Sequence, residues 1–343
     1  MATRRSLGSA SVRVAVLGAG SWGTTVASLV TRNTDQVVIW ARRPEVAEEI
    51  NTQRSNETYL PGLRLPRSLQ STDDLDEAVS GADVVIVAVP SQGFREALSH
   101  AAPLVRPWVP VVSLTKGFET DSLRRMSQVI EDLLPGHPAG ALTGPNLARE
   151  ILSGQAAAAV IAMEDDHVAV ALQRLFASGM FRVYTNEDVI GCEVGGALKN
   201  VIAIATGMAQ GLEAGDNTRA MIITRGLAEL TRLGVAMGGR AETFAGLAGM
   251  GDLVATCMSP FSRNRHVGEQ LGRGRTLDEI MGEMQMVAEG VKTSHLVMAL
   301  ARRFHVDLPI CESIHAVIEG RSTPVQAYRG LVRRMPGHES QSD

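Results

Sequence analysis

A glycine pattern near the N-terminus constrains the fold of this chain more than any other feature. The apolar run at residues 12–17 leads directly into Gly18, Gly20 and Gly23, and a helix-like segment follows them. In a G-x-G-x-x-G pattern of this kind, the first glycine permits a tight turn, the second lets a phosphate approach the backbone, and the third lets the helix pack closely against the strand. We therefore predict a strand–turn–helix unit that binds the pyrophosphate of a dinucleotide.

The residues that follow the glycines indicate which dinucleotide binds. Ser21 and Trp22 fall at the helix N-terminus, where free backbone N–H groups can meet phosphate. NAD-preferring domains usually carry an acidic residue about 20 positions later, whereas the second strand of this chain ends at Arg42 and Arg43. Two guanidinium groups can hold a 2′-phosphate, so we expect NADP(H), or both NADP(H) and NAD(H). The alternative is a solvated surface pair.

The length and the patterning of the chain indicate two domains. With 343 residues, the chain exceeds the roughly 150 residues of a typical domain. Short β-branched runs alternate with helix-like segments in the first half, which is typical of a parallel sheet wound with helices, and the second half has helical periodicity. We predict an α/β fold, with a Rossmann-type doubly wound domain at 11–187 and an all-α substrate-binding domain at 188–334.

Individual elements follow from the same patterns. The expected strands are 12–17, 37–40, 84–89 and 109–112, with weaker runs around Ala141 and Val160. The expected helices are 190–211, 217–235, 262–271, 287–304, 309–318 and 324–333. The run at 84–89 is apolar on both faces, so it should lie in the middle of the sheet.

Composition excludes several classes of protein. A formal net charge of -4 and the absence of long basic runs disfavour a nucleic-acid partner. The longest candidate for a membrane span, 201–209, is bounded by polar residues and is shorter than the ~18 residues that a span needs. The three cysteines, at 192, 257 and 311, have no metal-ligand spacing, so we expect buried thiols, no metal site and a cytoplasmic protein.

An adjacent lysine and amide interrupt a helix of small and apolar residues. Lys199 and Asn200 follow Gly195 and Gly196 in this helix. Glycines inside a helix cost about 1 kcal/mol each relative to alanine, which suggests that another group approaches closely. A buried lysine is unfavourable unless it is paired or its pKa falls, and lysines of lowered pKa exchange protons in catalysis. We interpret Lys199 as catalytic; the alternative is a solvated lysine on an amphipathic helix.

Two loops that follow strands add candidate ligand contacts. Lys116 comes just after the strand at 109–112, and Gly144 and Asn146 follow the apolar run around Ala141. Ligands of open α/β sheets bind at the carboxyl ends of the strands. A loop lysine is usually only solvated, so this signal is weaker than that of Lys199.

The helical half contains two further polar candidates. A glycine-rich segment places Asp252 after a flexible turn, from which its carboxylate could reach the lysine. Ser262, Arg263 and Asn264 open a helix with a hydroxyl, a guanidinium and an amide, which suits an oxyanion or phosphate but also fits an ordinary helix cap.

Read together, six segments resemble soluble, bacterial-type NAD(P)-dependent glycerol-3-phosphate dehydrogenase. They are 18–24, 114–117, 143–145, 195–200, 249–253 and 262–264, in the order of the family. The resemblance spans about 12–333 and implies hydride transfer with NAD(P)(H) between sn-glycerol 3-phosphate and dihydroxyacetone phosphate. That reaction supplies glycerol 3-phosphate for glycerophospholipid synthesis. We also expect a homodimer with these small molecules as its substrates.

The resemblance also implies roles for individual residues. Lys199 would be the proton acceptor in the oxidation direction, Asp252 its neighbour, and Lys116 a contact of both substrate and cofactor. The other implied substrate contacts are Gly144, Asn146, Asn200, Ser262, Arg263 and Asn264. Besides the three glycines, the implied cofactor contacts are Ser21, Trp22, Arg42, Arg43, Lys116, Ala148, Arg263, Val287 and Glu289. The family commonly has a small hydroxyl residue where this chain has Asn146.

Two alternatives share part of this pattern. The β-hydroxyacid and 6-phosphogluconate dehydrogenases also combine a Rossmann domain with a helix-borne lysine, but their lysine is typically followed four residues later by asparagine, where this chain has Ala203. A redox sensor would bind NADP(H) without turning it over. Absorbance of the reduced nicotinamide in the presence of dihydroxyacetone phosphate would distinguish these possibilities.

Overall fold

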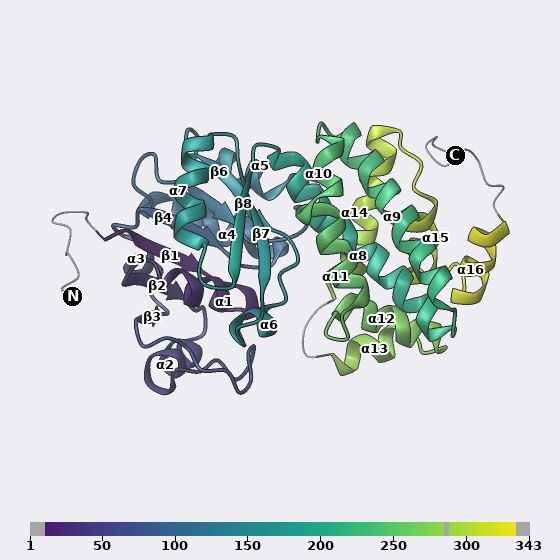
Figure 1. The fold of residues 1–343 in the computed structure, drawn as a ribbon, viewed down its shortest axis with the longest axis horizontal. Helices are drawn as coiled ribbons and strands as arrows, with labels where there is room; N and C mark the ends of the chain where they lie inside the picture. The colour runs from purple at the N-terminus through teal and green to yellow at the C-terminus, as the bar shows by residue number, and fades with distance from the viewer. Residues whose placement is uncertain (1–10, 285–287, 334–343) are drawn as a thin grey trace.

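A single eight-stranded sheet organises the first half of the chain. The computed structural model describes residues 11–284 and 288–333, and the strands run in the order β3-β2-β1-β4-β5-β6-β7-β8 (Figure 1). Their bounds are β1 Arg13–Leu17, β2 Gln36–Trp40, β3 Leu69–Thr72, β4 Val84–Val87, β5 Val111–Ser113, β6 Ala139–Thr143, β7 Ala157–Met163 and β8 Phe181–Asn186. The central position predicted for the run at 84–89 is confirmed for β4.

The sheet is mostly parallel, as predicted, and it contains one antiparallel pair among the described strands. Strand β7 pairs with β6 in the antiparallel direction, while the other neighbours are parallel. To pair in parallel, the next strand must start at the end of the sheet where the previous strand started, so the chain needs a long crossover connection. Between Thr143 and Ala157 there is only the five-residue helix α6, Ala148–Leu152, so the chain turns back along β6.

Helices cover both faces of this sheet, as a doubly wound fold requires. Successive residues of β1 point to opposite faces: Val14 and Val16 join one apolar cluster, and Ala15 and Leu17 join the other. Helices α1 (Ser21–Val30), α2 (Pro44–Gln53) and α7 (Asp166–Phe176) contribute to the first cluster. Helices α3 (Leu75–Val79), α4 (Ser91–Ala101) and α5 (Met126–Leu133) contribute to the second.

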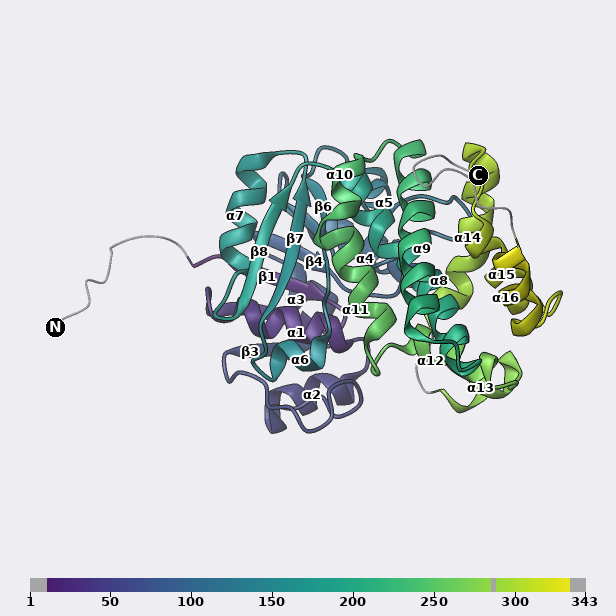
Figure 2. The same cartoon turned by 45° about the vertical axis from the view of Figure 1, so that its right-hand side comes forward.

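From residue 188 onward the described residues form helices and connecting loops. The helices are α8 Val189–Gly211, α9 Asp216–Ala236, α10 Ala241–Ala245, α11 Asp252–Met258, α12 Arg263–Gly272, α13 Leu277–Glu283, α14 Glu289–Phe304, α15 Pro309–Ile318 and α16 Pro324–Arg333. Figures 1 and 2 place α10 and α11 at the boundary between the sheet and the other helices. The structure thus has the predicted fold class, an α/β half followed by a helical half.

Helix α8 forms the core of the helical half. By length and composition it could cross a membrane, but 94% of its most apolar window is buried inside the protein. Its glycines allow close packing: a Cβ on Gly207 would lie 2.0 Å from the carbonyl oxygen of Arg265 on α12. A Cβ on Gly268 of α12 would equally lie 2.0 Å from the carbonyl oxygen of Ile204. Backbone contact between α8 and α12 therefore requires glycine on both helices.

Candidate active site

The turn between β1 and α1 leaves an open cradle. Gly18 has φ +113°, and a Cβ there would lie 2.8 Å from the carbonyl oxygen of Ala88. A Cβ on Gly23 would lie 2.1 Å from the carbonyl oxygen of Gly18, whereas one on Gly20 would meet nothing within 4 Å. No side chain caps α1, and its first turn has no acidic residue. Open space in front of uncapped N–H groups fits the pyrophosphate of a dinucleotide.

These glycines give a matched pair of variants. Gly20→Ala should keep stability within about 1 kcal/mol, because its methyl group enters open space, but should weaken NADPH binding at least about tenfold, a cost of about 1.4 kcal/mol. Gly23→Ala should instead destabilise the fold by about 1–3 kcal/mol through overpacking. Chemical denaturation and fluorescence titration with NADPH measure both effects. Unchanged NADPH affinity in folded Gly20→Ala would refute this placement of the pyrophosphate.

The other predicted cofactor contacts surround this cradle. The Ser21 hydroxyl donates a hydrogen bond to the carbonyl oxygen of Tyr59 at 2.9 Å. Trp22 has a buried Nε1 without a hydrogen-bond partner among the described residues. Arg42 is exposed just beyond β2, while the Arg43 guanidinium lies 5.7 Å from the centroid of the Tyr59 ring and 3.7 Å from Glu45. Tyr59 contacts both Ser21 and Arg43, but no motif in the sequence marks it as a site residue.

Two lysines share one buried carboxylate at the boundary between the two halves. Lys199 of α8 forms an ion pair with Oδ1 of Asp252, the first residue of α11, and donates to Oγ1 of Thr256 at 2.7 Å. Lys116, from the loop after β5, lies 2.5 Å from Oδ2 of Asp252 and donates to the carbonyl oxygen of Gly144 at 3.0 Å. Asp252 is only 1% exposed and Lys199 only 6%. The structure therefore brings all three predicted catalytic residues together.

The segment before Asp252 is ordered differently from the prediction. In place of a flexible turn, Leu247–Gly251 forms a short π-helical stretch that leads directly into α11. This stretch packs against α8, because a Cβ on Gly195 would lie 2.7 Å from the carbonyl oxygen of Ala248. A Cβ on Gly196 would likewise lie 2.9 Å from Oγ1 of Thr143. The two helix glycines thus admit the neighbours that their presence in the sequence indicated.

Burial and charge set the protonation of the site. Burial lowers the pKa of Lys199 to about 8; the Asp252 carboxylate opposes this shift and the charge of Lys116 adds to it. Burial also raises the pKa of Glu289 at the start of α14, against the opposing charges of Arg263, Lys116 and Lys199. A lysine with a pKa near 8 can both donate and accept a proton at physiological pH.

An unsatisfied amide lies in the loop after β6, which also contributes a contact to Lys116. Both side-chain atoms of Asn146 are buried without a hydrogen-bond partner among the described residues, and so is Oγ1 of Thr143. Gly144, between them in sequence, has φ +127° and directs its carbonyl oxygen to Lys116. Buried polar groups without partners are rare in proteins, so these groups fit a polar ligand.

The predicted phosphate contacts occupy the start of α12. The Ser262 hydroxyl caps the helix by accepting from the Arg265 N–H at 3.3 Å. Asn264 donates to Oδ1 of Asn200 at 2.8 Å and accepts from the Gly290 N–H at 2.9 Å, so its amide joins α12 to α8 and α14. Arg263 is exposed at this helix start. Among the other predicted cofactor contacts, Ala148 begins α6, and Val287 lies outside the described residues.

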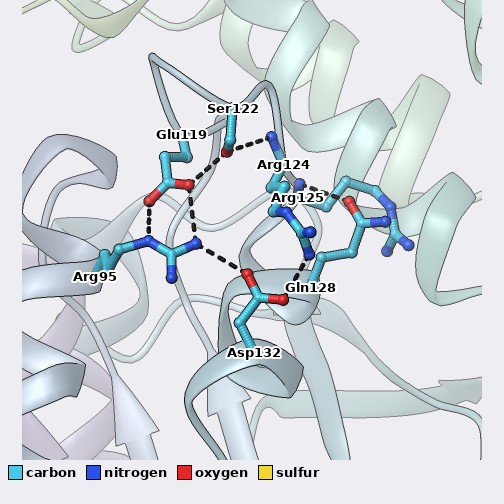
Figure 3. Close-up of polar contacts among 7 residues, drawn as sticks. All are labelled: Arg95, Glu119, Ser122, Arg124, Arg125, Gln128 and Asp132. Carbon is cyan, nitrogen blue, oxygen red and sulfur yellow. Dashed lines mark hydrogen bonds and ion pairs between the residues drawn. The ribbon is translucent and has the colours of Figure 1, made fainter.

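The loop that carries Lys116 is anchored at its far end (Figure 3). Arg95 of α4 donates to both carboxylate oxygens of Glu119, at 2.6 and 3.0 Å, and to Asp132 of α5 at 3.0 Å. Ser122 donates to Glu119, and Arg124 donates to Asp132 at 2.6 Å. Bidentate arginine–carboxylate pairs restrict geometry strongly. This network fixes the loop on which Lys116 depends.

A second anchor joins the end of the same loop to α8. Arg125 and the Ser127 hydroxyl each donate to the buried Glu193 carboxylate at 2.6 Å, and the Ser127 N–H donates to it at 2.8 Å. Glu193 lies in α8, the helix that carries Lys199. The two lysines are therefore held on elements that are themselves tied together.

Comparisons with known proteins identify the family of this chain. Residues 13–169 match the family model of the NAD-dependent glycerol-3-phosphate dehydrogenase N-terminus, and residues 188–329 match that of its C-terminus. Glycerol-3-phosphate dehydrogenase [NAD(P)+] 2 of Sphingopyxis alaskensis is 59% identical over 96% of this chain and 98% of the relative. The Mycobacterium avium glycerol-3-phosphate dehydrogenase [NAD(P)+] is 54% identical over 95% and 96%.

Solved structures support the same relationship. The crystal structure of glycerol-3-phosphate dehydrogenase from Coxiella burnetii has a TM-score of 0.90 at 35% identity, covering 94% of this chain and 99% of that one. A ketopantoate reductase from Ralstonia eutropha, with a TM-score of 0.56 at 18% identity, shares the fold alone. The chain belongs to the NAD-dependent glycerol-3-phosphate dehydrogenase family and is an NAD(P)-dependent oxidoreductase.

Proposed function

We propose that Lys116, Asp252 and Lys199 form the catalytic centre at which this enzyme interconverts sn-glycerol 3-phosphate and dihydroxyacetone phosphate. The observation that carries the proposal is the buried Asp252 carboxylate shared by two lysines, one of which has its pKa lowered to about 8. Strands β1 and β5 both run parallel to β4, so the glycine cradle and the Lys116 loop lie at the same edge of the sheet. A cofactor in the cradle can therefore face the lysines.

Lys199 is the residue that exchanges a proton with the substrate. When bound, the nicotinamide cofactor supplies or receives the hydride. In reduction, negative charge builds on the ketone oxygen, and the Lys199 ammonium stabilises that charge and delivers the proton. In oxidation, the neutral amine accepts the proton of the substrate hydroxyl. Asp252 positions both lysines, and Lys116 supplies a second positive charge beside the reacting oxygen.

The remaining predicted contacts hold cofactor and substrate around this centre. Those proposed for the cofactor are Gly18, Gly20, Ser21, Trp22, Gly23, Arg42, Arg43, Lys116, Ala148, Arg263 and Glu289. Those proposed for the substrate are Lys116, Gly144, Asn146, Lys199, Asn200, Asp252, Ser262, Arg263 and Asn264. With arginines at 42 and 43, NADPH should serve at least as well as NADH, which a comparison of the two kcat/KM values checks.

The proposed phosphate contact predicts a defined defect. Arg263→Ala should raise the KM for dihydroxyacetone phosphate about 10- to 100-fold, as expected for the loss of one charge-assisted contact. Unphosphorylated dihydroxyacetone should be a poor substrate of the parent enzyme and should be little affected by the substitution. Arg273→Ala, at the other end of α12, is the matched control. Equal kcat/KM for the two ketones in the parent enzyme would exclude a phosphate clamp.

We also propose the setting in which the enzyme works. It is a cytoplasmic homodimer that supplies glycerol 3-phosphate for glycerophospholipid synthesis, with a Rossmann-type domain at 11–187 and a substrate domain at 188–334. The three cysteines are buried free thiols, which suits a reducing compartment. Light scattering on the eluting protein measures the oligomeric state, and twice the 36.6 kDa mass of one chain is the expected result.

A further inference from the structure

Two histidines and a glutamate come together where α14 and α15 pack. His315 and Glu319 lie one helical turn apart, at the end of α15, and His295 faces them from α14. Nδ1 of His295 is 3.4 Å from Oε1 of Glu319, and the two imidazole rings meet edge to face with their centroids 4.8 Å apart. One potential ligand atom from each residue falls within 4.8 Å of the other two. None of the three belongs to the catalytic site described above.

The contacts within this cluster leave a possible metal-ligand atom without a hydrogen-bond partner among the described residues. Nδ1 of His315 is buried and has no hydrogen-bond partner among the described residues. Burial also lowers the pKa of His315, and this favours the neutral imidazole. Two cations lie nearby: Arg321, with Nε 3.8 Å from Glu319 Oε2, and Arg302, whose charge acts on His315. The Arg321 side chain is 58% exposed, so solvent screens much of its charge.

We propose that His295, His315 and Glu319 form a binding site for a divalent transition metal ion such as Zn²⁺. Two imidazole nitrogens and one carboxylate oxygen are a common three-ligand set for Zn²⁺, with water as the fourth ligand. Tetrahedral ligands at the usual bond lengths lie about 3.3 Å apart, which the His295–Glu319 spacing already matches. The ligand atom of His315 lies within 4.8 Å of the other two. Mg²⁺ and Ca²⁺ prefer all-oxygen sites and are not expected to bind here.

The position of the site defines its physical effect. An ion held there links the middle of α14 to the end of α15, two helices of the apolar core of the helical half. His295 and Glu319 are exposed and His315 is half-buried, so an ion can enter from solvent. The three cysteines are buried and do not compete for it. A bound ion should therefore stabilise the fold in proportion to its concentration relative to Kd.

The test is a Zn²⁺ titration of the full-length enzyme after treatment with EDTA, followed by calorimetry and by thermal unfolding. We expect one saturable site and a rise in Tm with Zn²⁺ but not with Mg²⁺. His295→Gln and His315→Gln should each weaken Zn²⁺ binding at least about tenfold and remove the rise in Tm. His100→Gln, which changes an exposed histidine of α4, should behave as the parent enzyme does.

Two results would overturn the proposal. One is the lack of saturable Zn²⁺ binding by the parent enzyme. The other is unchanged Zn²⁺ affinity in both histidine variants, which would place the binding elsewhere on the chain. If His315→Gln lowers Tm without metal because the residue is half-buried, His295→Gln at its exposed position still decides the question. Tetrahedral Co²⁺ absorption in the parent enzyme, lost in His295→Gln, would identify the ligand set independently of stability.

Discussion

Lys199→Met should lower kcat by roughly 10²- to 10⁴-fold, because it removes the group that we propose exchanges a proton with the substrate. Folding and NADPH affinity should be largely preserved. Methionine keeps much of the apolar stem of lysine, and Asp252 remains paired with Lys116 at 2.5 Å, so no buried carboxylate is left without a partner. Steady-state turnover with dihydroxyacetone phosphate, together with a fluorescence titration of NADPH, measures both parts of the prediction.

A matched substitution separates chemistry from the general loss of a lysine. Lys292 is exposed on α14, and Lys292→Met should leave turnover near that of the parent enzyme. Near-normal turnover in Lys199→Met, with cofactor binding intact, would mean that Lys199 is only a packed helix residue and that the proton comes from elsewhere.

Asp252→Asn should damage both activity and stability. The substitution leaves Lys116 and Lys199 without the carboxylate that they share, and removing one partner of a buried ion pair costs about 3–5 kcal/mol. Without Asp252 the pKa of Lys199 falls further, so Lys199 can release its proton, and this limits the loss of stability. Turnover should fall roughly 10²-fold, since Asp252 no longer holds the Nζ atoms of Lys116 and Lys199 in place. Urea unfolding and steady-state kinetics measure the two effects.

Asp83→Asn is the control for this variant. Asp83 pairs with Arg106 at 2.5 Å, but its side chain is 45% exposed, and surface pairs contribute about 0–1 kcal/mol. A stability loss in Asp252→Asn no larger than that of Asp83→Asn would contradict the description of Asp252 as a buried bridge between two cations.

Strong local patterns predicted the central part of the fold. The glycine turn, the buried run of β4 and the start of α12 each depend on residues adjacent in sequence, and each prediction is confirmed. The edge strands β3 and β8 were missed, because Leu69–Thr72 is short and mostly polar and Phe181–Asn186 contains no continuous apolar run. The alternation of Phe181, Arg182 and Val183 in the sequence of β8 was a usable signal, since a strand exposed on one face alternates apolar and polar residues.

Candidate site residues could be selected from the sequence, but their geometry could not be predicted from it. Lys116 and Asp252 are 136 positions apart, and their contact depends on how the Lys116 loop and α11 pack around α8. Thr256 could have been found, because it lies one helical turn after Asp252 and so shares its face. The anchoring pair of Arg95 and Glu119 could not, since a salt bridge between a helix and a distant loop leaves no periodic pattern.

The pH dependence of kcat/KM for glycerol 3-phosphate oxidation tests the central claim, that Lys199 exchanges the proton, most directly. Oxidation needs the neutral amine, and with the pKa of Lys199 lowered to about 8, kcat/KM should rise with pH through that value and level off above it. For the reduction of dihydroxyacetone phosphate, kcat/KM should instead fall as the pH rises through the pKa of Lys199. Ionisation of the substrate phosphate, near pH 6, adds a separate limb. The account predicts that Lys199→Met loses the limb near pH 8 and keeps the phosphate limb; retention of the limb near pH 8 in that variant would contradict it.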